Sequence, residues 1–298
     1  MTDLPVIIEV AVNETALRAK HGNDRIPYSP REIVEDACRA REAGAAILHW
    51  HGREPVSGEP RNDVELYLEV IEGVRARCDI LIHPTLGYIT QHAVDDRIRH
   101  IVAANSNPAT RVDFAPVDFG SLNVDYWDVE AKRWETDDKI YLNPRKNLTA
   151  VLEALRDHDV RTDAVCWEVG HIRTAKRYQE IGLLRDPFWL LVFTGARMPT
   201  GASQTLPGLL AMLAELDPDE PWFVCNWNGD VLPAAAWAIT LGGHVRCGLG
   251  DWQYVERGSP DNAQVVDWVA SIARAVGRPI ATPDDARAIL RLPAPVVT

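Results

Sequence analysis

Short apolar runs alternate along the chain with longer segments whose apolar residues recur at helical spacing. The runs are nearly continuous in apolar character, which is typical of strands that are buried on both faces of a parallel sheet. They are Pro5–Val12, Ala45–His51, Asp79–Thr85, Arg111–Val117, Thr162–Glu168, Phe188–Thr194, Trp222–Trp227 and His244–Gly248. The pattern therefore predicts eight parallel strands.

A helix is predicted after each strand. The first opens on the capping box Ser29-Pro30-Arg31-Glu32 and runs to about Ala43. The others are expected over Asp63–Arg77, His92–Ala104, Leu148–His158, Ile172–Ile181, Leu206–Leu216, Pro233–Leu241 and Asn262–Val276. Eight strand–helix units close a barrel more naturally than they extend an open sheet. We therefore expect an α/β chain folded as one (β/α)8 TIM-barrel domain over residues 1–298.

Two segments do not fit this minimal barrel. Residues Asn123 to Lys146, after the fourth strand, are polar and aromatic, and we expect them to form an excursion, with a hairpin as one form it could take. Thr282-Pro283-Asp284-Asp285 predicts the start of a short extra helix, to about Leu290.

Composition narrows the class of partner. The 298 residues carry a net charge of −12, which disfavours nucleic acid and anionic membrane surfaces. A small anion is still allowed, because a few arginines inside a pocket can set the local field. Five scattered cysteines without a C-x-x-C pair, no signal-peptide pattern and no long apolar run lead us to expect a cytoplasmic protein with reduced thiols.

Polar residues gather at the ends of the predicted strands, where barrel enzymes place their active sites. They are His49, His51, His83, Thr85, Asp118, Glu168, Asn226, Arg246 and Asp251. Among them Thr85 and Asn226, together with Glu9 of the first strand, are candidate substrate contacts. The dinucleotide-binding, P-loop and G-x-S-x-G motifs are absent.

Among these residues, the His49-Trp50-His51 segment most specifically indicates a functional site. Side chains two residues apart on a strand point the same way, so both imidazoles face one space. Converging imidazoles are common zinc ligands. The alternative is a pair of polar residues that form hydrogen bonds in the barrel mouth. A metal would need a third ligand, and Glu9, Glu168 and Asp251 could each supply a carboxylate.

Three charged residues within apolar runs each allow two interpretations. A carboxylate at Glu168 is costly unless it is functional or is an ion-pair partner for an arginine. Arg246 could neutralise a buried carboxylate or bind a substrate carboxylate through two hydrogen bonds. Glu9 could face the site, or it could equally face solvent or an interface.

Five segments together resemble the β-keto acid cleavage enzymes, a family whose founding activity is 3-keto-5-aminohexanoate cleavage. They are VIIEVAVN, SPREIVEDACRAREAGAAILHWHGREP, CWEVGHIRTAKRYQEIGLL, LGGHVRCGLGD and GRPIATPDDARAIL, and they span nearly the whole chain. The resemblance implies a zinc-dependent barrel that condenses a β-keto acid with acetyl-CoA and releases acetoacetate and a new CoA thioester. It also implies a homodimer or homotetramer.

The resemblance also implies roles for individual residues. His49 and His51 match the two zinc-ligand histidines of the family. Arg246 and Asp251 match an arginine–aspartate pair that generates the carbanion, and Glu168 matches a pocket glutamate. In this scheme zinc polarises the β-keto oxygen and Asp251 takes a proton.

The chain departs from the family pattern at several positions. Gly250 stands where the family has the glutamate that serves as third zinc ligand. Thr85 lies in the loop that contacts the substrate carboxylate, but Pro84 and Pro116 replace a serine and a threonine of the founding enzyme. The glycine-rich loop after the sixth strand is altered to TGARMPTG.

Three hypotheses follow from these residues. The first is a metal-dependent acyltransferase or lyase that cleaves a C–C bond of a β-keto acid. The second is a barrel enzyme of the same ancestry with altered chemistry, such as another keto-acid reaction or metal-assisted hydrolysis. The third is a non-catalytic relative that binds a small acid.

Overall fold

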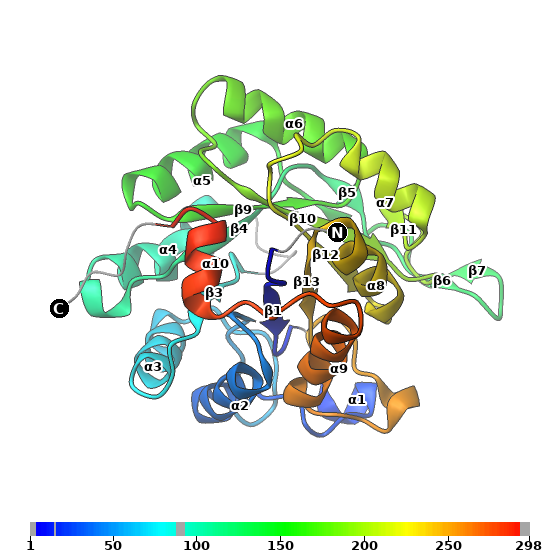
Figure 1. Ribbon diagram of the computed structural model, residues 1–298, viewed down its shortest axis with the longest axis horizontal. Helices are drawn as coiled ribbons and strands as arrows, with labels where there is room; N and C mark the ends of the chain where they lie inside the picture. Colours follow the sequence, from blue (N-terminus) through cyan, green and yellow to red (C-terminus); the bar gives the residue numbers. More distant parts are fainter. Residues whose placement is uncertain (1–3, 15, 88–92, 293–298) are drawn as a thin grey trace.

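Eight parallel strands form a nearly closed barrel with helices around it (Figure 1). The computed structural model describes residues 4–14, 16–87 and 93–292. The barrel strands are β1 (Ile8–Ala11), β2 (Ile47–Trp50), β3 (Leu81–Pro84), β4 (Phe114–Asp118), β9 (Arg161–Cys166), β10 (Phe188–Thr194), β12 (Trp222–Trp227) and β13 (His244–Cys247). Their order in the sheet is β3-β2-β1-β13-β12-β10-β9-β4, which confirms the predicted (β/α)8 fold.

The two ends of this sheet, β3 and β4, meet through Asp113. Its N–H donates to the carbonyl of Ile82 at 2.9 Å, and its carboxylate accepts the N–H of Ile82 at 2.8 Å. Further along the strands, Pro84 and Pro116 have no N–H to donate to a neighbour. These prolines explain why the described residues form no regular ladder between β3 and β4.

The helices follow the strands in the predicted order. They are α2 (Pro30–Ala43), α3 (Val64–Arg75), α4 (Val94–Asn105), α5 (Arg145–Asp157), α6 (Val169–Glu180), α7 (Leu206–Leu213), α8 (Leu232–Leu241), α9 (Asn262–Ala275) and α10 (Pro283–Ile289). Three short elements, α1 (Arg18–His21) and the 3-10 turns Pro108–Thr110 and Val255–Arg257, were not predicted. The capping box is present, with the Ser29 side chain accepting the N–H of Glu32. The predicted start of α4 at His92 lies outside the described residues.

Helices α5 and α6 each begin three residues before the predicted position. The first turn of α5 is polar (Arg145, Lys146, Asn147), so the apolar periodicity that predicts the helix starts one turn late. The end of β9 was also misplaced. The strand stops at Cys166, and Glu168 is already the N-cap residue of α6.

The excursion between β4 and α5 has the hairpin form. Strand β5 (Leu122–Asn123) pairs with β8 (Ile140–Tyr141), and β6 (Trp127–Asp128) pairs with β7 (Arg133–Trp134). The β6–β7 end projects from the barrel in Figure 1. The excursion contacts the loop after β10, because the Trp127 N–H donates to the Arg197 carbonyl at 2.7 Å. The two-residue strand β11 (Ala202–Ser203) pairs with β10 beyond that loop.

Apolar side chains form two layers. Ile8 belongs to the outer layer between strands and helices, whereas Ile7 and Phe114 belong to the layer that fills the barrel. Ala286 and Leu290, from α10 and its C-cap, join that inner layer. Helix α10 therefore covers the N-terminal end of the barrel (Figure 1) and leaves the C-terminal end for a pocket.

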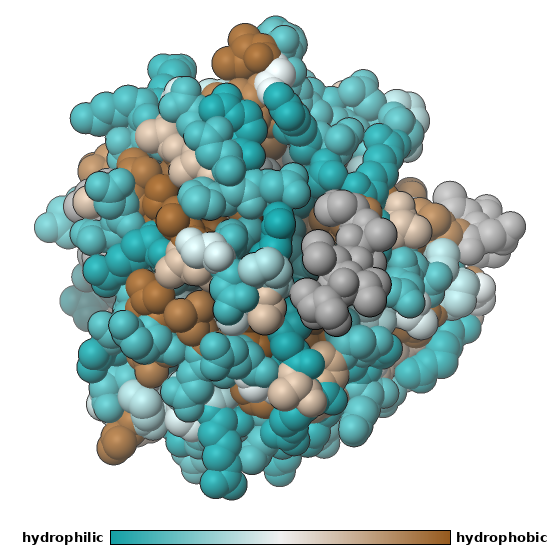
Figure 2. Space-filling view, turned by 90° about the vertical axis from the view of Figure 1, so that its left-hand side faces the viewer, coloured by the Kyte–Doolittle hydropathy of each residue, from teal (hydrophilic) through white to brown (hydrophobic). Residues whose placement is uncertain are grey.

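The molecular surface is mostly polar. The face shown in Figure 2 is largely hydrophilic, with hydrophobic residues in separate patches. Within the described part of the chain, no helix combines the length and the apolar character that crossing a bilayer requires.

Acid should destabilise the fold through His100. Its Nε2 lies 2.6 Å from the Thr85 carbonyl and its ring stacks on Tyr67, so burial lowers the pKa of His100 from 6.5 to about 4. In the unfolded chain the His100 imidazole is protonated below about pH 6.5, whereas in the folded chain it stays neutral down to about pH 4. Protonation of His100 therefore does not reduce the unfolding free energy above pH 6.5, and it reduces it increasingly as the pH falls towards 4.

The test is urea unfolding of the wild type and of His100→Gln at about pH 7.5 and about pH 5. We expect the difference in unfolding free energy between the two proteins to shrink by about 2 kcal/mol at the lower pH. A difference that does not change with pH would contradict this assignment.

Candidate active site

A pocket opens at the C-terminal ends of the barrel strands. It is lined by Glu14, His49, His51, Thr85, Gly87, Pro116, Asp118, Val124, Tyr126, Tyr141, Val165, Trp167, Leu190, Val192, Cys225, Trp227, Arg246 and Asp251. Six of the residues singled out from the sequence are thus brought together, namely His49, His51, Thr85, Asp118, Arg246 and Asp251.

The two histidines of the H-x-H segment converge as predicted. His49 Nε2 lies 3.4 Å from His51 Nε2, with the rings nearly perpendicular. The Asn13 side chain accepts the N–H of His51 at 2.8 Å and fixes the end of β2 against the loop after β1. Burial lowers the pKa of both imidazoles well below 6.5, and the positive charge of Arg246 lowers it further. Both rings are therefore neutral at pH 7, which is the form that binds a metal.

The spacing of the two nitrogens fits a zinc ion. Two imidazole nitrogens bound to zinc at about 2.05 Å in tetrahedral geometry are about 3.4 Å apart. The same distance also allows one neutral imidazole to donate an N–H···N hydrogen bond to the other. The donor set and its spacing therefore suit the cofactor that the sequence resemblance implies.

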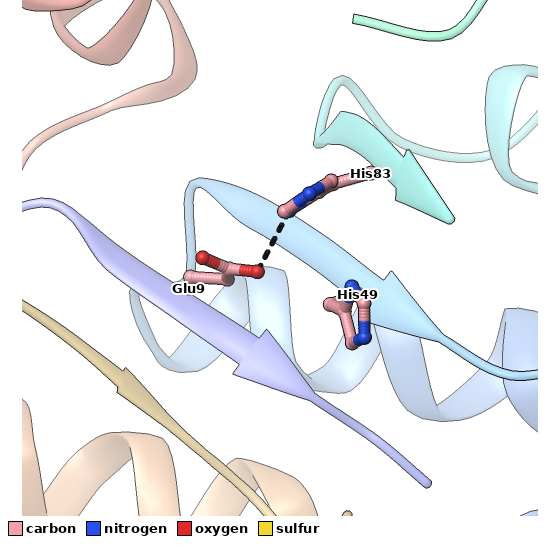
Figure 3. A group of neighbouring side chains, drawn as sticks. All are labelled: Glu9, His49 and His83. Carbon is pink, nitrogen blue, oxygen red and sulfur yellow. Dashed lines mark hydrogen bonds and ion pairs between the residues drawn. The ribbon is translucent and has the colours of Figure 1, made fainter. Parts of the chain in front are cut away.

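Glu9 and His83 lie beside His49 in the barrel interior (Figure 3). His83 Nδ1 is 2.8 Å from Glu9 Oε1, and both side chains are fully buried. Glu9, His49 and His83 come from adjacent strands β1, β2 and β3, and a ligand atom of each lies within 4.8 Å of the other two. The alternative that Glu9 faces solvent or an interface is wrong, because its neighbours Ile8 and Val10 occupy the outer layer.

Of the three carboxylates considered as a third metal ligand, Glu9 is thus the one that the described residues group with a site histidine. The Glu168 side chain is 55% exposed and 3.7 Å from His171, and it does not line the pocket. Asp251 is bound by Arg246.

Gly250 sits too close to the backbone of β1 to carry a side chain. A Cβ there would lie 2.7 Å from the Asn13 carbonyl oxygen and 3.0 Å from that of Ala11. The Gly250 N–H donates to the same Ala11 carbonyl at 2.9 Å. The family glutamate could not be accommodated here without a shift of the backbone, so any third ligand must come from another position.

Gly250→Ala should therefore destabilise the protein by about 2 kcal/mol through overpacking. The control is Gly170→Ala in α6, where the nearest atom to the new Cβ is the Glu168 carboxylate at 3.6 Å. That control should gain up to about 1 kcal/mol from helix propensity. Urea unfolding of the three proteins measures both effects. Equal stability of Gly250→Ala and the wild type would show that the loop has room for a side chain.

Arg246 and Asp251 form a buried ion pair at the pocket wall. Arg246 donates to both carboxylate oxygens of Asp251, at 3.2 Å from Nε and 3.0 Å from Nη2. Burial raises the pKa of Asp251, and the guanidinium partly offsets that rise. A carboxylate with a raised pKa in a pocket is suited to accept a proton from carbon acids.

Four of the residues singled out from the sequence lie outside the pocket lining, namely Glu9, His83, Glu168 and Asn226. Glu9 and His83 are buried in the barrel interior, so Glu9 does not line the pocket as a substrate contact. Glu168 was interpreted as a buried carboxylate, but the chain turns into α6 at this point and the side chain reaches solvent. Asn226 is buried and donates to Gln204 Oε1 at 2.5 Å and to the Asp230 carbonyl at 3.2 Å, so it holds two loops together. Thr85 does line the pocket, and its hydroxyl donates to the Gly87 carbonyl at 3.0 Å.

Sequence reasoning missed several lining residues. Glu14 follows β1 by three positions, which places it in the first βα loop, and this position alone could have singled it out. Tyr126 and Tyr141 come from the excursion, whose path across the barrel mouth has no local sequence signal. Trp167 and Trp227, which lie at strand ends, also line the pocket.

Comparison with known proteins agrees with this geometry. A family model described as beta-keto acid cleavage enzyme matches residues 5–292. A 3-keto-5-aminohexanoate cleavage enzyme of Fusobacterium nucleatum is 30% identical over 96% of this chain and 98% of its own. A 3-dehydrocarnitine:acetyl-CoA trimethylamine transferase of Rhizobium meliloti (94% and 93% covered) and a 3-oxoadipate:acetyl-CoA acetyltransferase of Cupriavidus necator (97% and 95%) are each 28% identical.

Among solved structures, ObcA in complex with oxaloacetate superposes with a TM-score of 0.69 at 14% identity, over 90% of this chain and 67% of that one. This likeness supports the barrel fold. The match of the family model across nearly the whole chain shows more: the chain belongs to the β-keto acid cleavage enzyme family and is an enzyme that acts on β-keto acids.

Proposed function

We propose that this enzyme condenses a β-keto acid with acetyl-CoA and releases acetoacetate and a new acyl-CoA, with zinc as its cofactor. In the balanced reaction the C2–C3 bond of the keto acid breaks and C2 becomes bonded to the acetyl carbonyl carbon. The CoA sulfur passes from the acetyl group to the remaining acyl group, and no electrons leave or enter. The names of the relatives support acetyl-CoA as the second substrate.

One observation carries this proposal: two neutral, converging imidazoles and a buried carboxylate–guanidinium pair line the same pocket. His49 and His51 would hold the zinc, with Glu9 as the third protein ligand in place of the glutamate that Gly250 excludes. The bound ion would act as a Lewis acid towards the β-keto oxygen.

Asp251 would accept the proton that leaves C2 of the keto acid. Its raised pKa makes it a better base than an exposed aspartate. Arg246 fixes the carboxylate through two hydrogen bonds and keeps it ionised in a buried setting. Thr85 also lines the pocket and would contact the substrate carboxylate.

The test is a panel of β-keto acids incubated with acetyl-CoA, with free acetoacetate as the readout and metal content measured on the same preparation. We expect acetoacetate from at least one member, about one zinc per chain and loss of turnover after chelation. Failure of every member would favour altered chemistry or a non-catalytic acid-binding protein. Activity that persists without metal would exclude the zinc-dependent form of the proposal.

A further inference from the structure

The side chain of Asn262 lies between three segments that are far apart in the sequence. It belongs to the first residue of α9 and is fully buried. Its Oδ1 accepts the N–H of Leu249, in the loop after β13, at 2.8 Å. Its Nδ2 donates to the Val12 carbonyl, just after β1, at 3.0 Å and to Asp36 Oδ2 of α2 at 2.5 Å. This amide thus uses both of its N–H groups and its oxygen.

Asp36 decides which way round the Asn262 amide lies. The two side chains meet because α2 and α9 are neighbours (Figure 1). The Asp36 carboxylate is buried and also accepts Arg39 Nη2 at 2.7 Å. Burial raises the pKa of Asp36 to about 6, and the bonds from Asn262 and Arg39 oppose that rise, so the group is mostly ionised at pH 7. Because a carboxylate only accepts hydrogen bonds, the amide nitrogen must face Asp36 and the amide oxygen must face Leu249.

Both backbone partners of this amide lie next to groups of the candidate active site. Leu249 is two residues before Asp251. Val12 is followed by Asn13, whose side chain accepts the N–H of His51. The buried amide therefore ties the loop that carries the proposed base to the segment that anchors the second histidine.

The loop after β13 lies directly against the end of β1. Gly248 and Gly250 flank Leu249, and a Cβ at Gly248 would overlap the Ala11 carbonyl oxygen. Two glycines give this loop conformational freedom that hydrogen bonds must restrict. The Gly250 N–H supplies one such bond, to the Ala11 carbonyl at 2.9 Å. The Leu249 N–H supplies another, and this one depends on Asn262.

We infer that Asn262 is a positioning residue, which holds Asp251 in place relative to the histidine pair through the Leu249 N–H. Asp36 keeps the Asn262 amide in the orientation that this bond requires. The role of Asp251 as the base rests on the proposed function. A displacement of about 1 Å at a reacting group can cost about 100-fold in rate, so a bond outside the pocket lining can still control turnover.

Asn262→Ala removes the acceptor of the Leu249 N–H. We expect kcat to fall about 100-fold, while KM for acetyl-CoA and the zinc content stay within about twofold of the wild type. The matched control is Asn105→Ala at the opposite end of the barrel. The Asn105 amide likewise accepts a backbone N–H, from Val112 at 3.1 Å, and donates to the His158 carbonyl at 3.1 Å. The control should keep wild-type kcat, and an equal fall in both variants would overturn the inference.

A second substitution at Asp251 separates positioning from general destabilisation. If Asn262 acts through the base, its loss should matter little once the base is gone. Adding Asn262→Ala to Asp251→Asn should therefore lower the residual kcat by less than about threefold. A further loss of about 100-fold, as independent effects would give, would overturn the inference.

Hydrogen–deuterium exchange tests the same bond without any substrate. Peptides that cover Leu249 and Gly250 should exchange slowly in the wild type and about tenfold faster in Asn262→Ala, but not in Asn105→Ala. Unprotected amides in the wild type, or unchanged exchange in Asn262→Ala, would overturn the inference. If the wild type turns over no β-keto acid, the proposed reaction fails, and the exchange rates alone then decide whether Asn262 positions this loop.

Discussion

Asp251→Asn is expected to lower kcat by about a thousandfold while the zinc content stays at the wild-type value. The substitution keeps the size of the side chain but removes the base that takes the proton from C2, and general bases contribute about 10²–10⁴ in rate. Because Asp251 is bound by Arg246 rather than grouped with the histidines, its loss should not release the metal.

Steady-state kinetics and elemental analysis of the same preparation measure the two effects. The control is Asp267→Asn, an exposed aspartate of α9 that pairs with Arg274 at 3.1 Å. It should match the wild type in both readouts. A variant at Asp251 that keeps more than about a tenth of wild-type kcat would show that another group is the base.

His49→Ala and His51→Ala should each lose the bound zinc on dialysis, and turnover with it. Each substitution removes one of the two imidazoles whose nitrogens are 3.4 Å apart, and the two protein ligands that remain are fewer than the three or four that hold zinc in proteins. Glu9→Gln distinguishes two roles for that carboxylate, a direct zinc ligand and a residue that only orients a ligand. If Glu9 binds zinc directly, the substitution should weaken zinc binding by far more than about 100-fold. If Glu9 only orients a ligand, zinc affinity should fall by about 10–100-fold.

Competition with a chromophoric zinc chelator measures these affinities. His158→Ala is the control, because this histidine is the C-cap residue of α5 and lies outside the pocket lining. Full zinc occupancy in both His49→Ala and His51→Ala would refute their assignment as ligands. Loss of zinc in His49→Ala but not in His51→Ala would instead assign the metal site to His49, Glu9 and His83.

The fold and the histidine pair were predictable because both depend on local rules. Buried parallel strands read as apolar runs, and residues two apart on a strand share a face whatever the rest of the chain does. The same rules place Arg246 in β13 facing the pocket and Asp251 in the loop that follows.

The sequence analysis was wrong or incomplete where the structure depends on contacts between distant segments. Glu168 reaches solvent because β9 ends two residues early and the chain turns into α6. The contact of Glu9 with His83 spans 74 residues, and only the barrel closes that gap. Whether a side chain fits at Gly250 depends on the path of the loop after β1, and no local sequence pattern specifies that path.

The central claim is that the acetyl group of acetyl-CoA becomes part of acetoacetate while CoA moves to the acyl part of the keto acid. Incubation of the enzyme with a β-keto acid and acetyl-CoA labelled with carbon-13 in both acetyl carbons tests it directly. The account predicts acetoacetate labelled only at C3 and C4 and a new acyl-CoA without label. Unlabelled acetoacetate, or label in the new acyl-CoA, would contradict it.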